Sequence, residues 1–191
     1  MERCRFDCQL SSYLSSTMRA YYMDDVEGDQ RASHDSGVSV GAEDLRGLGV
    51  LSYHFDTMDQ VDQLAKDRSY VNRDTVLITP EGLGGPEKYA EKLKIFFAEH
   101  LHEDEEIRYI LDGDGYFDVR DKSDAKWIRI HVEKGDLIIL PAGIYHRFTL
   151  SSNDYIKALR LFQNEPKWVA HNRPEADDNE YRLEYKKTIS V

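Results

Sequence analysis

The chain has 191 residues, and its 36 acidic against 25 basic side chains give a formal net charge of −11 at pH 7. This length fits one domain with a sizeable core. The acidic balance argues against nucleic acid as a partner and, because no apolar run is long enough to span a bilayer, we expect no insertion into a membrane.

Residues 1–17 are rich in serine and mix arginine with acidic residues, so they match neither a secretory signal nor a transit peptide. We expect a disordered N-terminal extension here. Met18 is a second candidate for the first residue of the cellular protein. Cys4 and Cys8 are the only cysteines and both lie in this extension, which disfavours a disulfide-stapled secreted domain and favours an intracellular protein.

We expect a single domain over residues 18–175 and a C-terminal tail over residues 176–191. Helix-like and strand-like segments alternate in the first half of the domain. The clearest helix is opened by Gly84-Gly85-Pro86, because proline suits a first helical turn and an apolar stripe follows it. In chain order, the expected elements are a short helix capped by Ser39, a strand at 50–55, a helix at 58–70, a strand at 74–79 and the helix that runs from Pro86 into His100.

From residue 106 onward the pattern changes to short strands separated by turns of glycine, aspartate and proline. Regular spacing of this kind indicates an antiparallel sandwich or barrel. We therefore expect a mainly β fold with a few flanking α-helices. The six expected strands lie at 106–111, 116–120, 127–132, 137–140, 144–150 and 155–162, and the Gly-Asp-Gly sequence at 113–115 is expected to be a turn.

The most informative stretch begins at His100, where His100, His102, Glu106 and Arg108 occupy even-numbered positions. Alternate residues of a β-strand point to one face, so these side chains would project together. Two imidazoles and a carboxylate supply the nitrogen and oxygen donors of a metal site. An isolated His-x-His is more often a surface or core pair, so the metal hypothesis depends on the in-phase glutamate and on a further ligand.

That further candidate is His146. It follows a buried strand, and Pro141-Ala142-Gly143 turns the chain back just before it. Closure of a small antiparallel barrel would bring this strand opposite the first. Three imidazoles and one carboxylate leave two positions open on a six-coordinate metal, and two adjacent open positions suit an anionic substrate that chelates through two oxygens, such as an enediolate.

These residues together match both motifs of the cupin superfamily, His100-x-His102-x-x-x-Glu106-x6-Gly113 and Gly135-x5-Pro141-x-Gly143-x-x-His146. Within cupins, the segments MRAYYMDD, HLHEDEEIRYILDGDGYFDVRD and WIRIHVEKGDLIILPAGIYHRFTL resemble the acireductone dioxygenase family of methionine salvage. The resemblance runs from Met18 to the region of Arg173-Pro174. Lys94 and Leu150 stand where many cupins have a glycine and an asparagine, but neither is a ligand position.

The resemblance implies a cupin-type antiparallel β-barrel (jelly roll) and an enzyme that cleaves acireductone, 1,2-dihydroxy-3-keto-5-methylthiopentene, with molecular oxygen. It implies one Fe(II) or Ni(II) per monomer. With Fe(II) the implied products are 2-keto-4-methylthiobutyrate and formate, and with Ni(II) they are methylthiopropionate, formate and carbon monoxide. A monomer in the cytoplasm is expected, with the nucleus as a second compartment. The implied metal ligands are His100, His102, Glu106 and His146.

Arg108 would share the strand face of Glu106, where its guanidinium would hold the negative charge of the substrate beside the metal. The alternative is a structural ion pair with Glu105 or an aspartate. Three aromatic residues suit either the core or an apolar slot around the methylthio tail of the substrate: Phe96, Phe97 and Phe148.

The remaining histidines have no in-phase ligand partner and are expected to be structural: His34, His54, His131 and His171. The acidic sequence Glu103-Asp104-Glu105 would form a solvated bend, with support of a ligand histidine as an alternative role for Glu105.

Two other functions stay open. A cupin sugar isomerase or epimerase would need acid and base residues in the pocket, and no lysine or spare histidine is in phase with the ligands. A non-catalytic metal-containing cupin that binds a partner would be favoured by loss of ligands, and all four are retained.

Overall fold

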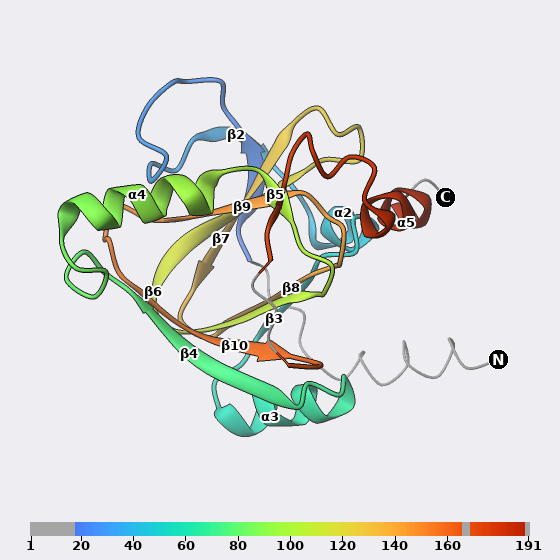
Figure 1. Ribbon diagram of the computed structural model, residues 1–191, viewed down its shortest axis with the longest axis horizontal. Helices are drawn as coiled ribbons and strands as arrows, with labels where there is room; N and C mark the ends of the chain where they lie inside the picture. Colours follow the sequence, from blue (N-terminus) through green and yellow to red (C-terminus); the bar gives the residue numbers. More distant parts are fainter. Residues whose placement is uncertain (1–17, 166–168, 190–191) are drawn as a thin grey trace.

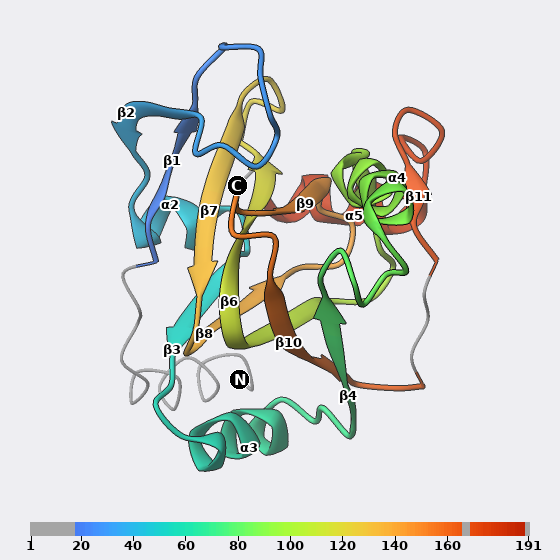
Figure 2. The same cartoon turned by 90° about the vertical axis from the view of Figure 1, so that its left-hand side faces the viewer.

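The computed structural model describes residues 18–165 and 169–189, so the extension expected at residues 1–17 lies outside the described part of the chain. The described residues form an antiparallel β structure with four helices (Figures 1 and 2). The strands are β1 (Ala20–Met23), β2 (Asp35–Ser39), β3 (Leu51–His54), β4 (Asn72–Ile78), β5 (His100–Leu101), β6 (Glu106–Arg120), β7 (Trp127–Glu133), β8 (Asp136–Leu140), β9 (His146–Leu150), β10 (Ile156–Phe162) and β11 (His171–Asn172). The helices are α2 (Ala42–Gly47), α3 (Met58–Asp67), α4 (Pro86–Phe97) and α5 (Glu180–Ile189).

Two hydrogen-bonded layers share strand β6. One runs in the order β11-β5-β9-β6-β7-β1-β2, and the other joins β4, β10, β6, β8 and β3. The path of hydrogen bonds does not return to its first strand. The expected mainly β antiparallel fold with a few helices is therefore confirmed, while the sheet itself is not closed into a complete barrel.

Strand β6 crosses from one layer to the other. Its first half pairs with β8 and β10, and its second half pairs with β7 and β9. The turn expected at 113–115 is wrong, because these residues continue the strand. Gly113 has a φ of +75°, and a Cβ at this position would collide with the backbone of Tyr155. The glycine therefore permits a close approach of two strands rather than a hairpin.

Side chains in the first half of β6 point alternately to its two faces and so contribute to two apolar clusters, one outside and one between the layers. Ile107 and Tyr109 belong to the outer cluster, which helix α3 covers (Figure 1). Ile110 belongs to the inner cluster between the layers. Glu106 and Arg108 share the parity of Ile110, so they face the same interior. All five residues of β8 are buried, as expected for a strand covered on both faces.

The C-terminal segment contains a packed helix, whereas a loose tail was expected for residues 176–191. Helix α5 buries Arg182 and Tyr185, and the Tyr185 hydroxyl donates to the carbonyl of Leu48 at 3.1 Å. A Cβ on Gly143 would collide with the backbone of Tyr181 in this helix. The second sequence motif therefore needs its glycine partly because α5 packs on it.

The other helices lie close to their expected positions. Helix α3 ends at Asp67, and α4 extends from Pro86 to Phe97. Helix α2 begins at Ala42 with Gly41 as its N-cap, because Ser39 pairs with β1 as the last residue of β2. Within the described ranges, no helix combines the length and the apolar character that crossing a membrane requires.

Candidate metal centre

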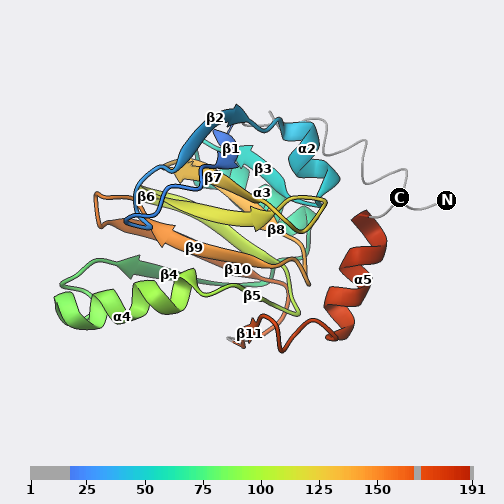
Figure 3. The same cartoon turned by 90° about the horizontal axis from the view of Figure 1, so that it is seen from above.

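The two candidate ligand segments meet on neighbouring strands. His100 in β5 lies opposite His146 at the start of β9, and Figure 3 shows these strands side by side. His102 follows β5, and Glu106 opens β6 after a bend. The expectation that His100 to Arg108 alternate along one strand is wrong, because the chain bends between β5 and β6. The bend still delivers His102 and Glu106 to the same place.

The three imidazole rings face one another, and one ring nitrogen of each lies within 4.8 Å of the others. Each Nδ1 contacts a backbone carbonyl: that of His100 is 2.7 Å from Ala98 O, that of His102 is 2.7 Å from Val169 O and that of His146 is 3.1 Å from Ile144 O. A carbonyl only accepts, so each Nδ1 carries a proton, and in the neutral form of each ring Nε2 has the lone pair. Such carbonyl partners commonly orient histidines toward a metal.

Glu106 places a carboxylate against this cluster. Its Oε2 lies 3.2 Å from His102 Nε2 and 3.4 Å from His146 Nε2, and Arg108 Nη2 lies 3.3 Å from its Oε1. Burial is the largest influence and acts to raise the pKa of Glu106, but the Arg108 guanidinium together with the His102 and His146 imidazoles outweighs it and holds the pKa well below its usual range. The side chain is therefore an anionic oxygen donor.

The donor set fits a divalent transition metal. Burial, together with His146, lowers the pKa of His100 to about 4, so this imidazole is neutral near neutral pH. His146 is 2% exposed, and its Nε2 has no hydrogen-bond partner among the described residues. The nearby Glu106 carboxylate has no proton to offer it. A buried lone pair in this situation is costly unless a metal binds it, and three imidazole nitrogens with one carboxylate suit iron, nickel, cobalt or manganese.

The four candidate ligands line a cavity of about 350 Å³. Phe96 and Phe148 form part of its wall and meet edge to face, with ring centroids 6.2 Å apart. Arg108 lines the cavity beside the ligands. An apolar wall with a few convergent charged groups is typical of a small-molecule site. Further apolar lining comes from Val76, Ile78, Ile110, Ile156 and Ala158.

Arg160 and Lys92 also line this cavity, although the sequence pattern pointed to neither. Arg160 lies opposite Arg108 on the neighbouring strand and is bound to Asp74 at 2.6 and 2.7 Å. The alternation of side chains along the strand expected at 155–162 could have indicated the face on which Arg160 lies. To place that face in the cavity, however, one must know that β10 pairs with β6.

Phe97 does not line the cavity that its neighbour Phe96 borders. Successive residues of a helix point about 100° apart, so two adjacent phenylalanines of α4 face different surroundings. The Phe97 ring stacks on the guanidinium of Arg147, 3.9 Å from the ring centroid, and borders a separate surface hollow. The structure thus brings Phe96 and Phe148 to the candidate site and leaves Phe97 out.

Glu105 does not stand behind a ligand histidine. Its carboxylate accepts hydrogen bonds from Arg68 at 2.8 Å and from the Tyr70 hydroxyl at 2.6 Å. The ion-pair partner of Arg108 is Glu106, a candidate ligand, rather than Glu105. The structure therefore gives Glu105 a role in attaching the bend to the end of helix α3.

The other described histidines lie outside the metal cluster. Each has a ring nitrogen near a carboxylate, which agrees with the structural roles expected for them. The pairs are His34 with Asp24 at 3.1 Å, His54 with Asp136 at 2.8 Å, His131 with Asp114 at 3.1 Å and His171 with Glu103 at 3.4 Å.

Comparison with known proteins establishes the family. The model of the ARD/ARD' family matches residues 19–170. The chain belongs to the ARD/ARD' family. An acireductone dioxygenase of Yarrowia lipolytica is 61% identical over 175 residues, which cover 91% of this chain and 100% of the relative. An acireductone dioxygenase of Sclerotinia sclerotiorum is 60% identical over 173 residues, which cover 90% of this chain and 97% of the relative.

A solved structure shares the fold of this ARD/ARD' family member. It is the acireductone dioxygenase from Bacillus anthracis with a cadmium ion in its active center. The two chains are 21% identical with a TM-score of 0.64, and the match covers 82% of this chain and 99% of that one. The resemblance to the acireductone dioxygenase family, inferred from three segments of the sequence, is thus confirmed.

Proposed function

We propose that this member of the ARD/ARD' family is a metal-dependent dioxygenase of methionine salvage that cleaves acireductone with molecular oxygen. The relatives named acireductone dioxygenase support this proposal by their identity over most of the chain. The observation that carries it is the clustering of three histidines, with the Glu106 carboxylate within 3.4 Å of two of them, in a cavity that Arg108 also lines.

In the proposed site, the protein holds one metal ion through four side chains. Their Nε2 lone pairs and the carboxylate leave two positions of a six-coordinate ion for the substrate. When bound, Fe(II) or Ni(II) would accept the charge of the chelated enediolate and orient it for reaction with oxygen. The proposed metal ligands are His100, His102, Glu106 and His146.

Arg108 is proposed to bind the anionic oxygens of the substrate. The side chain of Arg108 is 17% exposed and lines the cavity beside Glu106, so a substrate oxygen would meet its guanidinium in surroundings with little water. Charge-assisted hydrogen bonds of this kind are about twice as strong as neutral ones. Arg108 would thereby hold the enediolate in one orientation, which brings the reacting carbon into position before oxygen arrives.

The apolar wall is proposed to hold the methylthio tail and to exclude water. Phe96 and Phe148 supply the rings, and a thioether makes favourable contacts with aromatic edges. Water exclusion strengthens the charged contacts in the cavity and protects a reactive substrate from side reactions. The two product sets proposed for Fe(II) and Ni(II) each contain all atoms of the substrate and of one O2, so neither needs another reactant.

The decisive experiment separates the two metals. Metal-free protein is loaded anaerobically with Fe(II) or with Ni(II), acireductone and oxygen are added, and oxygen uptake and products are measured. We expect 2-keto-4-methylthiobutyrate and formate with Fe(II), and methylthiopropionate, formate and carbon monoxide with Ni(II). Absence of oxygen uptake above the uncatalysed rate with both metals would refute the proposed function.

Two other functional classes are less well supported. A sugar isomerase or epimerase needs acid and base groups in the cavity. The histidines that line it are all candidate ligands, Arg160 is paired with Asp74, and Lys92 is an exposed residue of α4. A non-catalytic binding protein would not need a cavity in which the donor cluster meets an arginine. A monomer with one metal ion, active in the cytoplasm, completes the proposal, and light scattering of the metal-loaded protein tests the oligomeric state.

A further inference from the structure

Residues 169–177 form a segment near the C-terminus that runs beside β5, the strand that contains the candidate ligand His100. We name this segment the strap. Within it, β11 pairs with β5. The backbone N–H of Arg173 donates to the carbonyl of Glu99 at 3.0 Å. At the other end of the strap, the Val169 carbonyl accepts the Nδ1–H of His102 at 2.7 Å. The strap therefore supplies the group that sets the tautomer of one candidate ligand.

Backbone pairing alone holds the strap weakly. Strands β5 and β11 have two residues each, and short strand pairs are marginal in water without further packing. Val169 is 58% exposed, and Asn172 is exposed as well, so burial of apolar surface adds little at these positions. The position of the Val169 carbonyl must therefore depend on side-chain contacts elsewhere in the strap.

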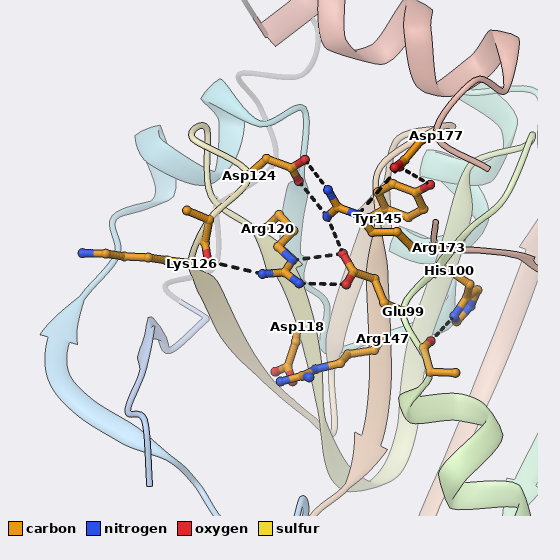
Figure 4. Close-up of polar contacts among 12 residues, drawn as sticks. Glu99, His100, Asp118, Arg120, Asp124, Lys126, Tyr145, Arg147, Arg173 and Asp177 are labelled. Atoms are coloured by element: carbon orange, nitrogen blue, oxygen red, sulfur yellow. Dashed lines mark hydrogen bonds and ion pairs between the residues drawn. The ribbon is translucent and has the colours of Figure 1, made fainter. Parts of the chain in front are cut away.

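Arg173 makes several of these contacts. Its guanidinium binds the Glu99 carboxylate at 2.9 Å and the two Asp124 oxygens at 2.9 and 3.3 Å (Figure 4). Glu99 directly precedes the ligand His100, and Asp124 lies in the turn between β6 and β7. One planar guanidinium thus joins the strap to two other segments, a geometry that a lysine side chain does not provide.

The two carboxylates that Arg173 binds are themselves fixed. Arg120 donates to Glu99 at 3.0 and 2.7 Å, and Arg182 of helix α5 lies 3.0 Å from Asp124. Glu99 is 17% exposed and Asp124 27% exposed, so neither is a mobile surface group. Arg173 therefore binds two carboxylates that other arginines, Arg120 and Arg182, already hold in place.

We infer that Arg173 is a positioning residue for the metal ligand His102. It fixes the strap, and the strap fixes the Val169 carbonyl. That carbonyl holds the Nδ1 proton of His102, so that the Nε2 lone pair faces the other ligands. The inference rests on the proposed metal site, but it adds a separate claim: a side chain outside the cavity lining controls how well that site binds metal.

The test uses the full-length protein, first without metal, and the variant Arg173→Gln. Long-range proton–nitrogen NMR spectra report the tautomer of His102, and titration with Ni(II) reports the affinity. We expect a single tautomer with protonated Nδ1 in the wild type and a mixture of tautomers in the variant. We expect Ni(II) affinity to fall about 10- to 100-fold, the usual effect of removing outer support of a ligand. Arg173→Lys should recover part of this loss, because an ammonium can still reach one carboxylate.

Arg31→Gln is the matched control. Arg31 also binds two carboxylates, those of Asp29 at 2.6 Å and Asp154 at 2.7 Å, and it is 29% exposed against 27% for Arg173. Neither carboxylate is a candidate ligand. We expect Arg31→Gln to lower thermal stability without changing the Ni(II) affinity or the His102 tautomer. Asp124→Asn keeps Arg173 but weakens one of its anchors, and it should shift both readouts in the same direction by a smaller amount.

An unchanged Ni(II) affinity and an unchanged His102 tautomer in Arg173→Gln would overturn the inference, and so would an equal loss of affinity in Arg31→Gln. If Arg173→Gln does not fold, Asp124→Asn decides by the same two measurements. Wild-type protein that binds one equivalent of Ni(II) but consumes no oxygen with acireductone with either metal would refute the proposed function and leave the role of Arg173 intact. Wild-type protein that binds no metal would refute both.

Discussion

His100 and His146 lie opposite each other on neighbouring antiparallel strands, with ring centroids 4.5 Å apart, although β6, β7 and β8 lie between them in the chain. On its other side, β9 pairs His146 with Val119 of β6. The backbone of His146 is therefore held by strand pairing on both sides. Its side chain can be changed without removing the hydrogen bonds that keep the strand in place.

His146→Ala should therefore abolish stable metal binding while the sheet stays folded. The variant removes a buried donor whose Nε2 has no hydrogen-bond partner among the described residues. We expect Ni(II) affinity to fall by at least about 100-fold, since a ligand contributes more than its outer supports. Metal content after reconstitution, measured by atomic absorption, tests this, and circular dichroism checks the fold.

His131→Ala is the control for this prediction. His131 also lies on a strand, but its ring contacts Asp114 at 3.1 Å, outside the metal cluster. It should keep a full equivalent of metal. Retention of that full equivalent by His146→Ala would remove His146 from the ligand set.

Arg108→Gln should leave metal binding nearly intact and slow turnover. The variant loses the guanidinium that lines the cavity beside Glu106, and with it the proposed contact to the anionic substrate. We expect kcat/KM to fall about 100-fold, which corresponds to about 2.7 kcal/mol of transition-state stabilisation. Arg73→Gln removes an exposed arginine paired with Asp62 and should have no effect. Unchanged steady-state oxygen uptake by metal-loaded Arg108→Gln would exclude the proposed role.

Phe148→Ala and Phe97→Ala should have different effects, because only Phe148 lines the cavity. We expect Phe148→Ala to raise KM for acireductone about tenfold through loss of contact with the methylthio tail. Phe97→Ala should leave KM unchanged and lower the free energy of unfolding by about 1–2 kcal/mol, because its ring stacks on Arg147. A substrate analogue without the methylthio group should reduce the effect of Phe148→Ala. Equal KM values for the two variants would contradict the proposed wall.

Local sequence patterns located most helices and strands, but they did not show the course of β6. A glycine at position 113 is compatible with a turn, and equally with a strand whose backbone is closely approached by another segment. The choice is made by the backbone of Tyr155, which presses against Gly113 from a distant part of the chain. Helix α5 was not predicted either, because it is also stabilised by residues distant in the sequence. Its Tyr185 is buried through contacts such as the hydrogen bond to Leu48, which no local pattern reveals.

The candidate ligands could be found in the sequence because their chemistry lies in side chains at characteristic spacings. The groups that orient them could not, because a backbone carbonyl such as that of Val169 has no sequence signature. Parity correctly placed Glu106 and Arg108 toward one interior. It failed for His102, because a bend, not a continuous strand, connects this residue to Glu106.

Asp118→Asn should strongly destabilise the fold without touching the cavity. Asp118 is completely buried and accepts hydrogen bonds from Arg129 at 2.7 and 2.8 Å and from Arg147 at 2.8 Å. The variant leaves the buried Arg129 without a countercharge, which typically costs about 3–5 kcal/mol. Urea denaturation of the metal-free protein measures the loss. Asp62→Asn, in an exposed pair with Arg73, should cost less than about 1 kcal/mol, and similar losses in both variants would contradict the prediction.

His54 should give the protein a pH-dependent contribution to stability away from the metal site. Its Nδ1 lies 2.8 Å from Asp136, and this hydrogen bond is the main cause that raises its pKa above 6.5, with further contributions from Asp56 and Glu133. The folded state therefore binds the proton more tightly than the unfolded state. The stabilisation is complete below a pH of about 6.5 and is lost as the pH rises through the folded-state pKa.

His54→Gln should remove this contribution. Because the side chain of His54 is 46% exposed, solvent screening keeps the effect below about 1 kcal/mol. We expect wild type to exceed the variant in free energy of unfolding by more at about pH 5 than at about pH 9. The comparison cancels the titration of the candidate ligands, which both proteins share. A His54 pKa at or below its ordinary value in an NMR titration, or an equal difference at both pH values, would show that Asp136 does not stabilise the imidazolium.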